Sequence, residues 1–87
     1  MCFEYNVNKS LSNELKHGID FEEAQGLWDD PLMVEAPLLF PDEKRYLCIG
    51  KIRGKHWSAI ITYRGECIRI ISVRRSRKKE IEIYEDF

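Results

Sequence analysis

Apolar residues recur at helical spacing near the start of the chain. Leu11 and Leu15 lie four residues apart and would share one face of a helix over residues 8–16. Asn8 is a candidate N-cap, because its side-chain oxygen can accept a hydrogen bond from the first turn. Gly18 supplies the left-handed residue on which helices commonly end. The pattern therefore predicts a short N-terminal helix.

A second helix is predicted directly after the first. Asp20 is a candidate N-cap, and Glu23 follows three residues later, as in a capping box. The residues expected on its buried side are Phe21, Ala24, Leu27 and Trp28. This helix should end at residues 29–30, because the residue before a proline, here Pro31, is biased out of the helical conformation.

The pattern changes to that of strands in the second half of the chain. Three runs rich in β-branched and aromatic residues occupy residues 46–52, 57–63 and 67–73. The spacers between these runs are short and contain Gly54 and Gly65, which implies hairpins and an antiparallel meander. Residues 32–36 are a weaker candidate for an additional edge strand.

The last segment fits two patterns. Residues 80–84 alternate as a strand would, whereas Ser76 can cap a helix that runs to Tyr84. We favour the helix, because residues 77–80 are good helix formers and poor strand formers. The predicted fold is α+β, with two N-terminal helices, an antiparallel three- to four-stranded sheet and a C-terminal helix, in one domain over residues 1–87.

The composition is that of a folded protein, with 44% hydrophobic and 33% charged residues. No apolar run approaches the roughly 20 residues that a membrane span needs. Residues 1–6 lack the basic and apolar regions of a secretory signal. We therefore expect a cytoplasmic protein with no membrane association.

The formal net charge of −1 hides an asymmetry between the two halves of the chain. Residues 1–43 contain two cations and ten acidic residues, whereas residues 44–87 contain twelve cations and five acidic residues. The basic half is suited to bind a polyanion or an acidic partner. The alternative is that the two halves neutralise each other in the folded protein.

The three cysteines are widely spaced and include no Cys-x-x-Cys pair, which argues against a structural zinc site. Cys48 and Cys67 fall inside apolar runs and are interpreted as small core residues. Asp29 and Asp30 offer two carboxylates to a metal, but adjacent acids before a proline are also typical of a helix-ending turn. We expect no metal and no cofactor.

Residues 64–79 contain seven cations and a single acid, Glu66. Within the third strand, Arg69 shares an apolar row with Ile71 and Val73. It can pair with an acid from the helices or reach toward a ligand. Further cations follow at the junction of this strand and the last helix, where guanidinium groups and helix amides suit a phosphate. The alternative is a solvated basic surface.

The two histidines differ in their surroundings. His17 lies beside the predicted helix end, where it can interact with the helix C-terminus or act as a general acid or base. His56 opens a strand and is interpreted as solvent-facing. The sequence contains no Gly-rich phosphate loop, no His-Glu-x-x-His motif and no nucleophile elbow.

These motifs together resemble the BrnT toxin family, in an order and spacing that span about residues 3 to 85. The matching pieces are Lys16-His17-Gly18, Phe21-Glu22-Glu23-Ala24, Asp30-Pro31, Arg45 with Ile49-Gly50 four residues on, Arg64-Gly65, Ile68-Arg69-Ile70-Ile71-Ser72-Val73-Arg74-Arg75, Arg77-Lys78-Lys79-Glu80 and Tyr84.

The resemblance implies a ribonuclease toxin of a bacterial type II toxin–antitoxin system with a RelE-like fold. Such a toxin cleaves RNA and blocks translation. The implied partner is a BrnA-like antitoxin that carries a ribbon-helix-helix module, in a complex of two toxins with two antitoxins. Operator DNA would be bound only through the antitoxin. The RNA substrate supplies its own nucleophile, the ribose 2′-hydroxyl, so the chemistry needs no metal.

The candidate site residues follow from the same resemblance. The candidates for catalysis are His17, Arg45, Arg69, Arg74, Arg75 and Glu80, and the candidates for RNA binding are Tyr63, Arg64, Arg77, Lys78 and Tyr84. The arginines suit phosphate binding and stabilisation of the transition state, and His17 and Glu80 are the acid–base candidates.

The competing hypothesis is a non-catalytic basic module that binds a partner protein or nucleic acid. Residues 36–42 depart from the family pattern, because Leu38, Leu39 and Phe40 make this loop unusually apolar. The loop can form a docking surface for a partner, or it can fold over the core.

Overall fold

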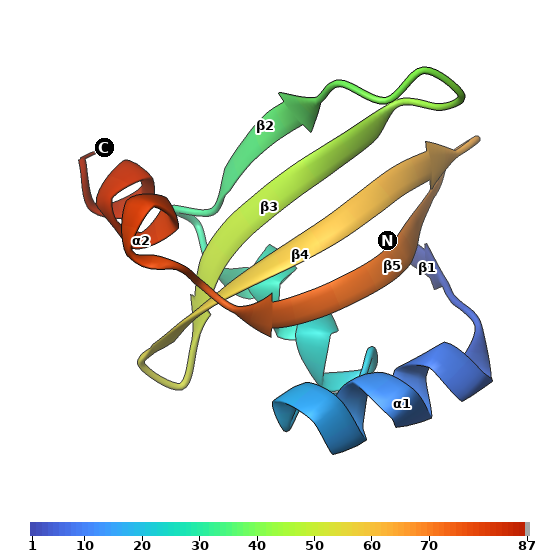
Figure 1. Cartoon of the computed structure of the whole chain (residues 1–87), viewed down its shortest axis with the longest axis horizontal. Coiled ribbons are helices and arrows are strands. Elements are labelled where there is room, and N and C mark those ends of the chain that lie inside the picture. The colour runs from blue at the N-terminus through green and yellow to red at the C-terminus, as the bar shows by residue number, and fades with distance from the viewer. Residues whose placement is uncertain (87) are drawn as a thin grey trace.

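Within residues 1–86, five strands form one mixed sheet in the order β1-β5-β4-β3-β2, with three helical segments around it (Figure 1). The computed structural model describes residues 1–86. The strands are β1 Cys2–Glu4, β2 Val34–Leu38, β3 Arg45–Ile52, β4 Lys55–Arg64 and β5 Cys67–Arg75. The helices are α1 Val7–His17, the 3-10 helix η1 Glu23–Asp29, and α2 Lys78–Glu85. The predicted α+β class is therefore confirmed.

The three central strands, β3, β4 and β5, form the predicted antiparallel meander. Arg53 and Gly54 both have positive φ, 50° and 78°, as a tight turn between twisted strands requires. The weakly predicted edge strand is also present, although it begins two residues later than expected. Its Pro37 is tolerated because an edge strand does not need every backbone N–H in the sheet.

The first strand, β1, was not predicted, and it makes the sheet mixed. It pairs in parallel with β5, with Phe3 opposite Ile68 and Glu4 opposite Arg69. The expectation of a purely antiparallel sheet of three or four strands is therefore wrong. Three residues are too short a segment to show a strand period in the sequence.

Cys2 and Cys67 lie opposite each other on β1 and β5 and form a disulfide, with their Cα atoms 4.6 Å apart. The interpretation of Cys67 as a small core residue is therefore wrong, because Cys67 is only partly buried and is bonded to Cys2. Cys48 is fully buried and unpaired, as predicted. Burial raises the pKa of the Cys48 thiol to about 12, and the neighbouring Glu35 carboxylate adds to this rise.

Helix α1 is oriented with its apolar side toward solvent. It starts one residue earlier than predicted, at Val7, with Asn6 and not Asn8 as its N-cap, and it ends at Gly18 as predicted. Leu11 and Leu15 share a face, but their side chains are 56% and 89% exposed. The residues that α1 buries are polar, so its packing depends on hydrogen bonds.

Those hydrogen bonds come mainly from Asn13, which closes the part of β5 that β1 does not cover. The Asn13 side-chain amide donates to the carbonyl of Val73 at 2.9 Å, and its oxygen accepts from the Val73 N–H at 3.1 Å. The same amide donates to the Ile19 carbonyl at 2.8 Å. Asn13 therefore substitutes for a strand residue at an otherwise open sheet edge.

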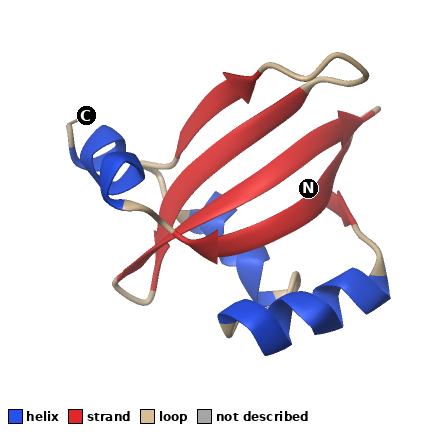
Figure 2. Cartoon of the chain, viewed as in Figure 1, coloured by secondary structure: helices blue, strands red, loops and turns tan. Residues whose placement is uncertain are grey.

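The core lies between the sheet and the segment that contains η1. Phe21, Ala24 and Leu27 are buried there as predicted, and Asp20 caps the N–H of Glu23 at 2.7 Å. The predicted second helix is present as a 3-10 helix, and Figure 2 shows it behind the sheet in blue. No helix within residues 1–86 is long and apolar enough to cross a membrane.

The alternation predicted along β5 is broken by a β-bulge at Ile71, which has no partner on β4. Val73 therefore joins Ile70 in the core, on the face opposite to Arg69. The prediction that Arg69 and Val73 share a face is wrong for this reason.

Helix α2 packs at the end of the sheet where β5 ends and β4 begins (Figure 1). This confirms the choice of helix over strand for the last segment. Its N-cap is Arg77 and not the predicted Ser76, whose hydroxyl lies 2.8 Å from that of Ser58.

Candidate functional site

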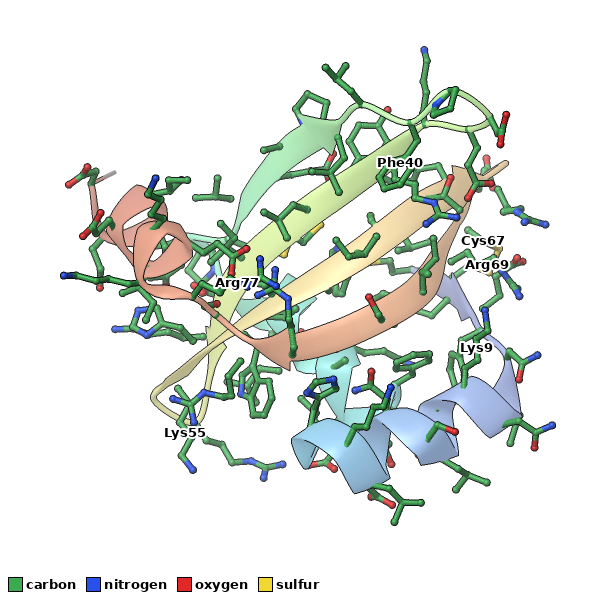
Figure 3. All side chains as sticks on the ribbon, in the orientation of Figure 1. Lys9, Phe40, Lys55, Cys67, Arg69 and Arg77 are labelled. Atoms are coloured by element: carbon green, nitrogen blue, oxygen red, sulfur yellow. A yellow bond between two sulfur atoms is a disulfide. The ribbon has the colours of Figure 1, made fainter. Side chains whose placement is uncertain are left out.

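The candidate residues separate into two groups at opposite ends of the sheet. Arg69 lies near the start of β5 and Arg75 at its end, about 20 Å apart at the usual rise per strand residue. Figure 3 shows Arg69 and Arg77 correspondingly far apart. The first group comprises Arg74, Arg75, Arg77, Lys78, Glu80 and Tyr84, and the second comprises Arg45, Tyr63, Arg64 and Arg69.

An ion pair between Arg74 and Glu80 organises the first group. The two guanidinium NH2 groups of Arg74 donate to the two oxygens of the Glu80 carboxylate at 2.7 and 2.8 Å. The hydroxyl of Ser58 and the backbone N–H of Arg77 also donate to this carboxylate, at 2.9 and 2.8 Å. The Glu80 side chain is only 11% exposed, so β4, β5 and α2 meet at one buried charge.

These contacts determine the protonation of the pair. The hydrogen bonds from Arg74, followed by those from Arg77 and Ser58, lower the pKa of Glu80 to about 2 against the opposing effect of burial. The hydrogen bond to Glu80 likewise raises the pKa of Arg74. Glu80 is therefore an ionised anchor for Arg74 at neutral pH, and it is poorly suited to donate a proton.

The remaining cations of this group are exposed. No salt bridge within residues 1–86 involves Arg75, Arg77 or Lys78. The guanidinium carbon of Arg75 lies 5.5 Å from the centre of the Trp57 ring. In the sequence, these three residues lie between the paired Arg74 and Glu80. Their side-chain N–H groups are available to bind a phosphate.

Tyr84 holds α2 to the turn before β2. Its hydroxyl donates to the Asp30 carboxylate at 2.7 Å, and the same carboxylate accepts the backbone N–H groups of Lys51 and Leu32. The hydrogen bond to Asp30 raises the pKa of Tyr84 to about 12. Burial raises the pKa of Asp30, but the hydrogen bonds from Lys51, Tyr84 and Leu32 outweigh it, so that pKa is lowered overall.

His56 lies under α2, so its interpretation as a solvent-facing residue is wrong. Its side chain is 17% exposed, packs edge-on against the ring of Tyr84, and brings Nε2 to 3.5 Å from the Glu85 carboxylate. Sequence reasoning also missed Ser58. Strand alternation does place both side chains on one face, but nothing in the sequence indicates that α2 covers that face.

Most members of the second group have partners within the fold. Arg69 pairs with Glu4 at 3.2 Å, so the ion-pair alternative is observed, with an acid of β1 and not of a helix. Arg45 pairs with Glu43 at 2.9 Å. Arg64, at the β4–β5 turn, is exposed.

Tyr63 in the same group donates a hydrogen bond of 2.6 Å to Glu35. Burial and this bond raise the pKa of its hydroxyl. Its ring packs edge-on against that of Tyr46. Nearby, Leu39 is fully exposed and Phe40 half exposed, so the apolar loop does not fold over the core.

His17 is exposed at the end of α1, near the first group. The next residue, Gly18, lines a cavity of about 160 Å³ together with Glu23, Lys55 and Trp57. Trp57 lies in this cavity wall and also contacts Arg75. His17, next to Gly18, is therefore at the same end of the molecule as the exposed cations.

One group of three acids, Glu14, Asp20 and Glu23, lies close together in the described part of the chain, with oxygens within 4.8 Å. Local contacts already engage two of them, because Asp20 caps η1 and Glu23 faces Arg53 at 3.5 Å.

Comparison with known proteins identifies the family of this chain. Among curated proteins, none matches the chain. Residues 5–80 match the family model described as the ribonuclease toxin BrnT of a type II toxin–antitoxin system. The match runs from before α1 to the first turn of α2 and therefore includes both Arg74 and Glu80. The chain belongs to the BrnT family of ribonuclease toxins of type II toxin–antitoxin systems.

Proposed function

We propose that this ribonuclease toxin cleaves RNA without a metal, on the surface formed by Arg75, Arg77 and Lys78. The observation that carries the proposal is that these cations are exposed beside the anchored Arg74 and form no salt bridge within residues 1–86. The 2′-hydroxyl of the substrate would attack the neighbouring phosphate. The guanidinium groups would hold that phosphate in line and stabilise the charge that develops on it.

The other candidate residues are given separate roles in this proposal. Arg74 and Glu80 position the cations by holding β5 to α2, and Tyr84 holds α2 to the turn before β2. His17 is the acid–base candidate, because it is exposed at the same end of the molecule and an imidazole can both accept and donate a proton. In the second group, Arg45, Tyr63 and Arg69 stabilise the fold, and Arg64 is a more distant contact for the RNA backbone.

A toxin of a type II system has a cognate antitoxin as its partner. We propose that this partner is BrnA-like, with a ribbon-helix-helix module that alone contacts operator DNA, and that the complex contains two copies of each chain. The exposed apolar loop around Leu39 and Phe40 is a candidate docking surface for it. The free toxin would be a single RelE-like domain that acts in the cytoplasm and blocks translation.

The proposal is tested by inducing the chain alone in a bacterial host and by cleaving RNA with the purified protein. Arg75→Ala combined with Arg77→Ala should relieve growth arrest and slow cleavage at least about a hundredfold, because phosphate stabilisation is lost. Lys9→Ala is the matched control, since it removes an exposed cation from α1 and should leave both readouts unchanged.

Two results would contradict this proposal. Cleavage that disappears in EDTA and returns with a divalent cation would show that a metal takes part. RNA that is bound but left intact by a folded protein would instead support the non-catalytic interpretation of the basic surface.

A further inference from the structure

We propose that the cavity between η1 and the β3–β4 hairpin binds one nucleobase of the RNA, and that this base is guanine. The proposal rests on the function proposed above and adds a specificity site to it. The cavity has a volume of about 160 Å³, and its polar lining residues are Glu23, Arg53 and Lys55.

The walls of the cavity are suited to a planar base. Ile19, Ile52 and Trp57 form its apolar part. Proteins that read RNA sequence commonly accept an unstacked base of a single strand against aromatic and apolar side chains. A base in this cavity would lose contact with water on its apolar faces, as it does in a base stack.

The cavity is also continuous with the phosphate-binding surface. Arg75 lies over the ring of Trp57, so a wall of the cavity contacts one of the exposed cations. Two cations are exposed at the cavity rim, namely Arg53 on the turn between β3 and β4, and Lys55 at the start of β4. A nucleotide whose base enters the cavity would therefore have its phosphate among these three cations.

Glu23 gives the cavity its preference among bases. Its carboxylate has two acceptor oxygens and no donor when ionised. On the Watson–Crick edge of guanine, the N1–H and N2–H groups are adjacent donors that match both oxygens. Adenine, cytosine and uracil each place an acceptor beside their donor on that edge, and this acceptor would be repelled by the carboxylate.

The present contact of Glu23 does not block this role. Its carboxylate lies 3.5 Å from the guanidinium of Arg53, which is 79% exposed. An exposed ion pair of this kind contributes little stability, so Arg53 can move to the phosphate when a base binds. The backbone of Glu23 is held in place independently, because its N–H is capped by Asp20.

The test measures binding and not cleavage, so it does not depend on the proposed catalytic surface. The folded protein is titrated with GMP, AMP, CMP and UMP, and the indole N–H of Trp57 and the amides of Gly18 and Lys55 are followed by NMR. We expect GMP to shift these signals and to bind about tenfold more tightly than the other three nucleotides. Glu23→Gln should remove this preference, and the matched control Glu22→Gln, in the neighbouring exposed acid, should keep it.

Equal binding of all four nucleotides, no shift at Trp57, or a guanine preference that survives Glu23→Gln would each overturn the proposal. A protein that binds GMP as expected but cleaves no RNA would instead contradict the proposed catalytic surface and leave the cavity assignment standing. In a protein that does cleave, wild type should cut next to guanine, and Glu23→Gln should cut with less regard to the base.

Discussion

Arg74 and Arg75 are adjacent in the sequence, but their environments differ. Arg74 is bound to Glu80 through both of its NH2 groups, whereas Arg75 lies over Trp57 and forms no salt bridge within residues 1–86. The charge pattern predicted a cationic cluster at this point of the chain. It could not show which cation is neutralised, because that depends on where α2 places Glu80.

Substituting each arginine should separate their roles. Arg74→Ala should lower the free energy of unfolding by about 2 kcal/mol, because it leaves the Glu80 carboxylate buried without its main partner. Arg75→Ala should cost less than about 1 kcal/mol, since it removes only an exposed contact with an aromatic ring. Urea denaturation of both variants measures the difference, and equal losses would show that the ion pair is not a stabilising element.

The lowered pKa of Glu80 predicts a dependence of stability on pH. The pKa is about 2 in the folded protein and 4.5 ordinarily, so the stabilising contribution is present above pH 4.5 and is lost as the pH falls toward 2. The wild type should lose roughly 3 kcal/mol more than Glu80→Gln over this range. Denaturation at several pH values checks this, with the exposed Glu82→Gln as a control that should follow the wild type.

At the scale of the elements, the packing of α1 against the sheet depends on Asn13 more than on the leucines of this helix. Asn13→Ala should lower the free energy of unfolding by about 2 to 3 kcal/mol, because both the N–H and the carbonyl of Val73 lose their partner in a buried site. Hydrogen exchange at the Val73 amide should also become faster. Ser12→Ala, on the exposed side of the same helix, is the control, and an equal effect of the two substitutions would argue against the edge-closing role.

The elements that could be predicted are those in which hydrophobic and polar residues alternate with a clear period. The meander over residues 46–73 alternates strongly, and the helix before it has recognisable start and stop residues. The bulge at Ile71 could not be predicted, because it is a shift in the pairing of β4 with β5 and leaves no mark on the sequence. Strand β1 could not be predicted either, because it is defined by its pairing with β5, which is distant in the sequence. The burial of His56 was missed for the same reason, since only the packed position of α2 covers it.

At the scale of the whole molecule, the acidic and basic halves neutralise each other only in part. In the described part of the chain, three salt bridges join residues 1–43 to residues 44–86, namely Glu4 to Arg69, Glu23 to Arg53 and Glu43 to Arg45. Within residues 1–86, none involves the cations that follow Arg74. Both interpretations of the charge asymmetry therefore apply, to different regions of the surface.

The link between Cys2 and Cys67 also has a consequence for the whole molecule. It joins residues 65 apart in the sequence and turns most of the chain into a covalent ring, with β5 and α2 continuing beyond it. A protease that cuts the exposed loop at Leu39 would open this ring without releasing a fragment. Where the cysteines are reduced, the same cut would yield two pieces held together only by the sheet and the core.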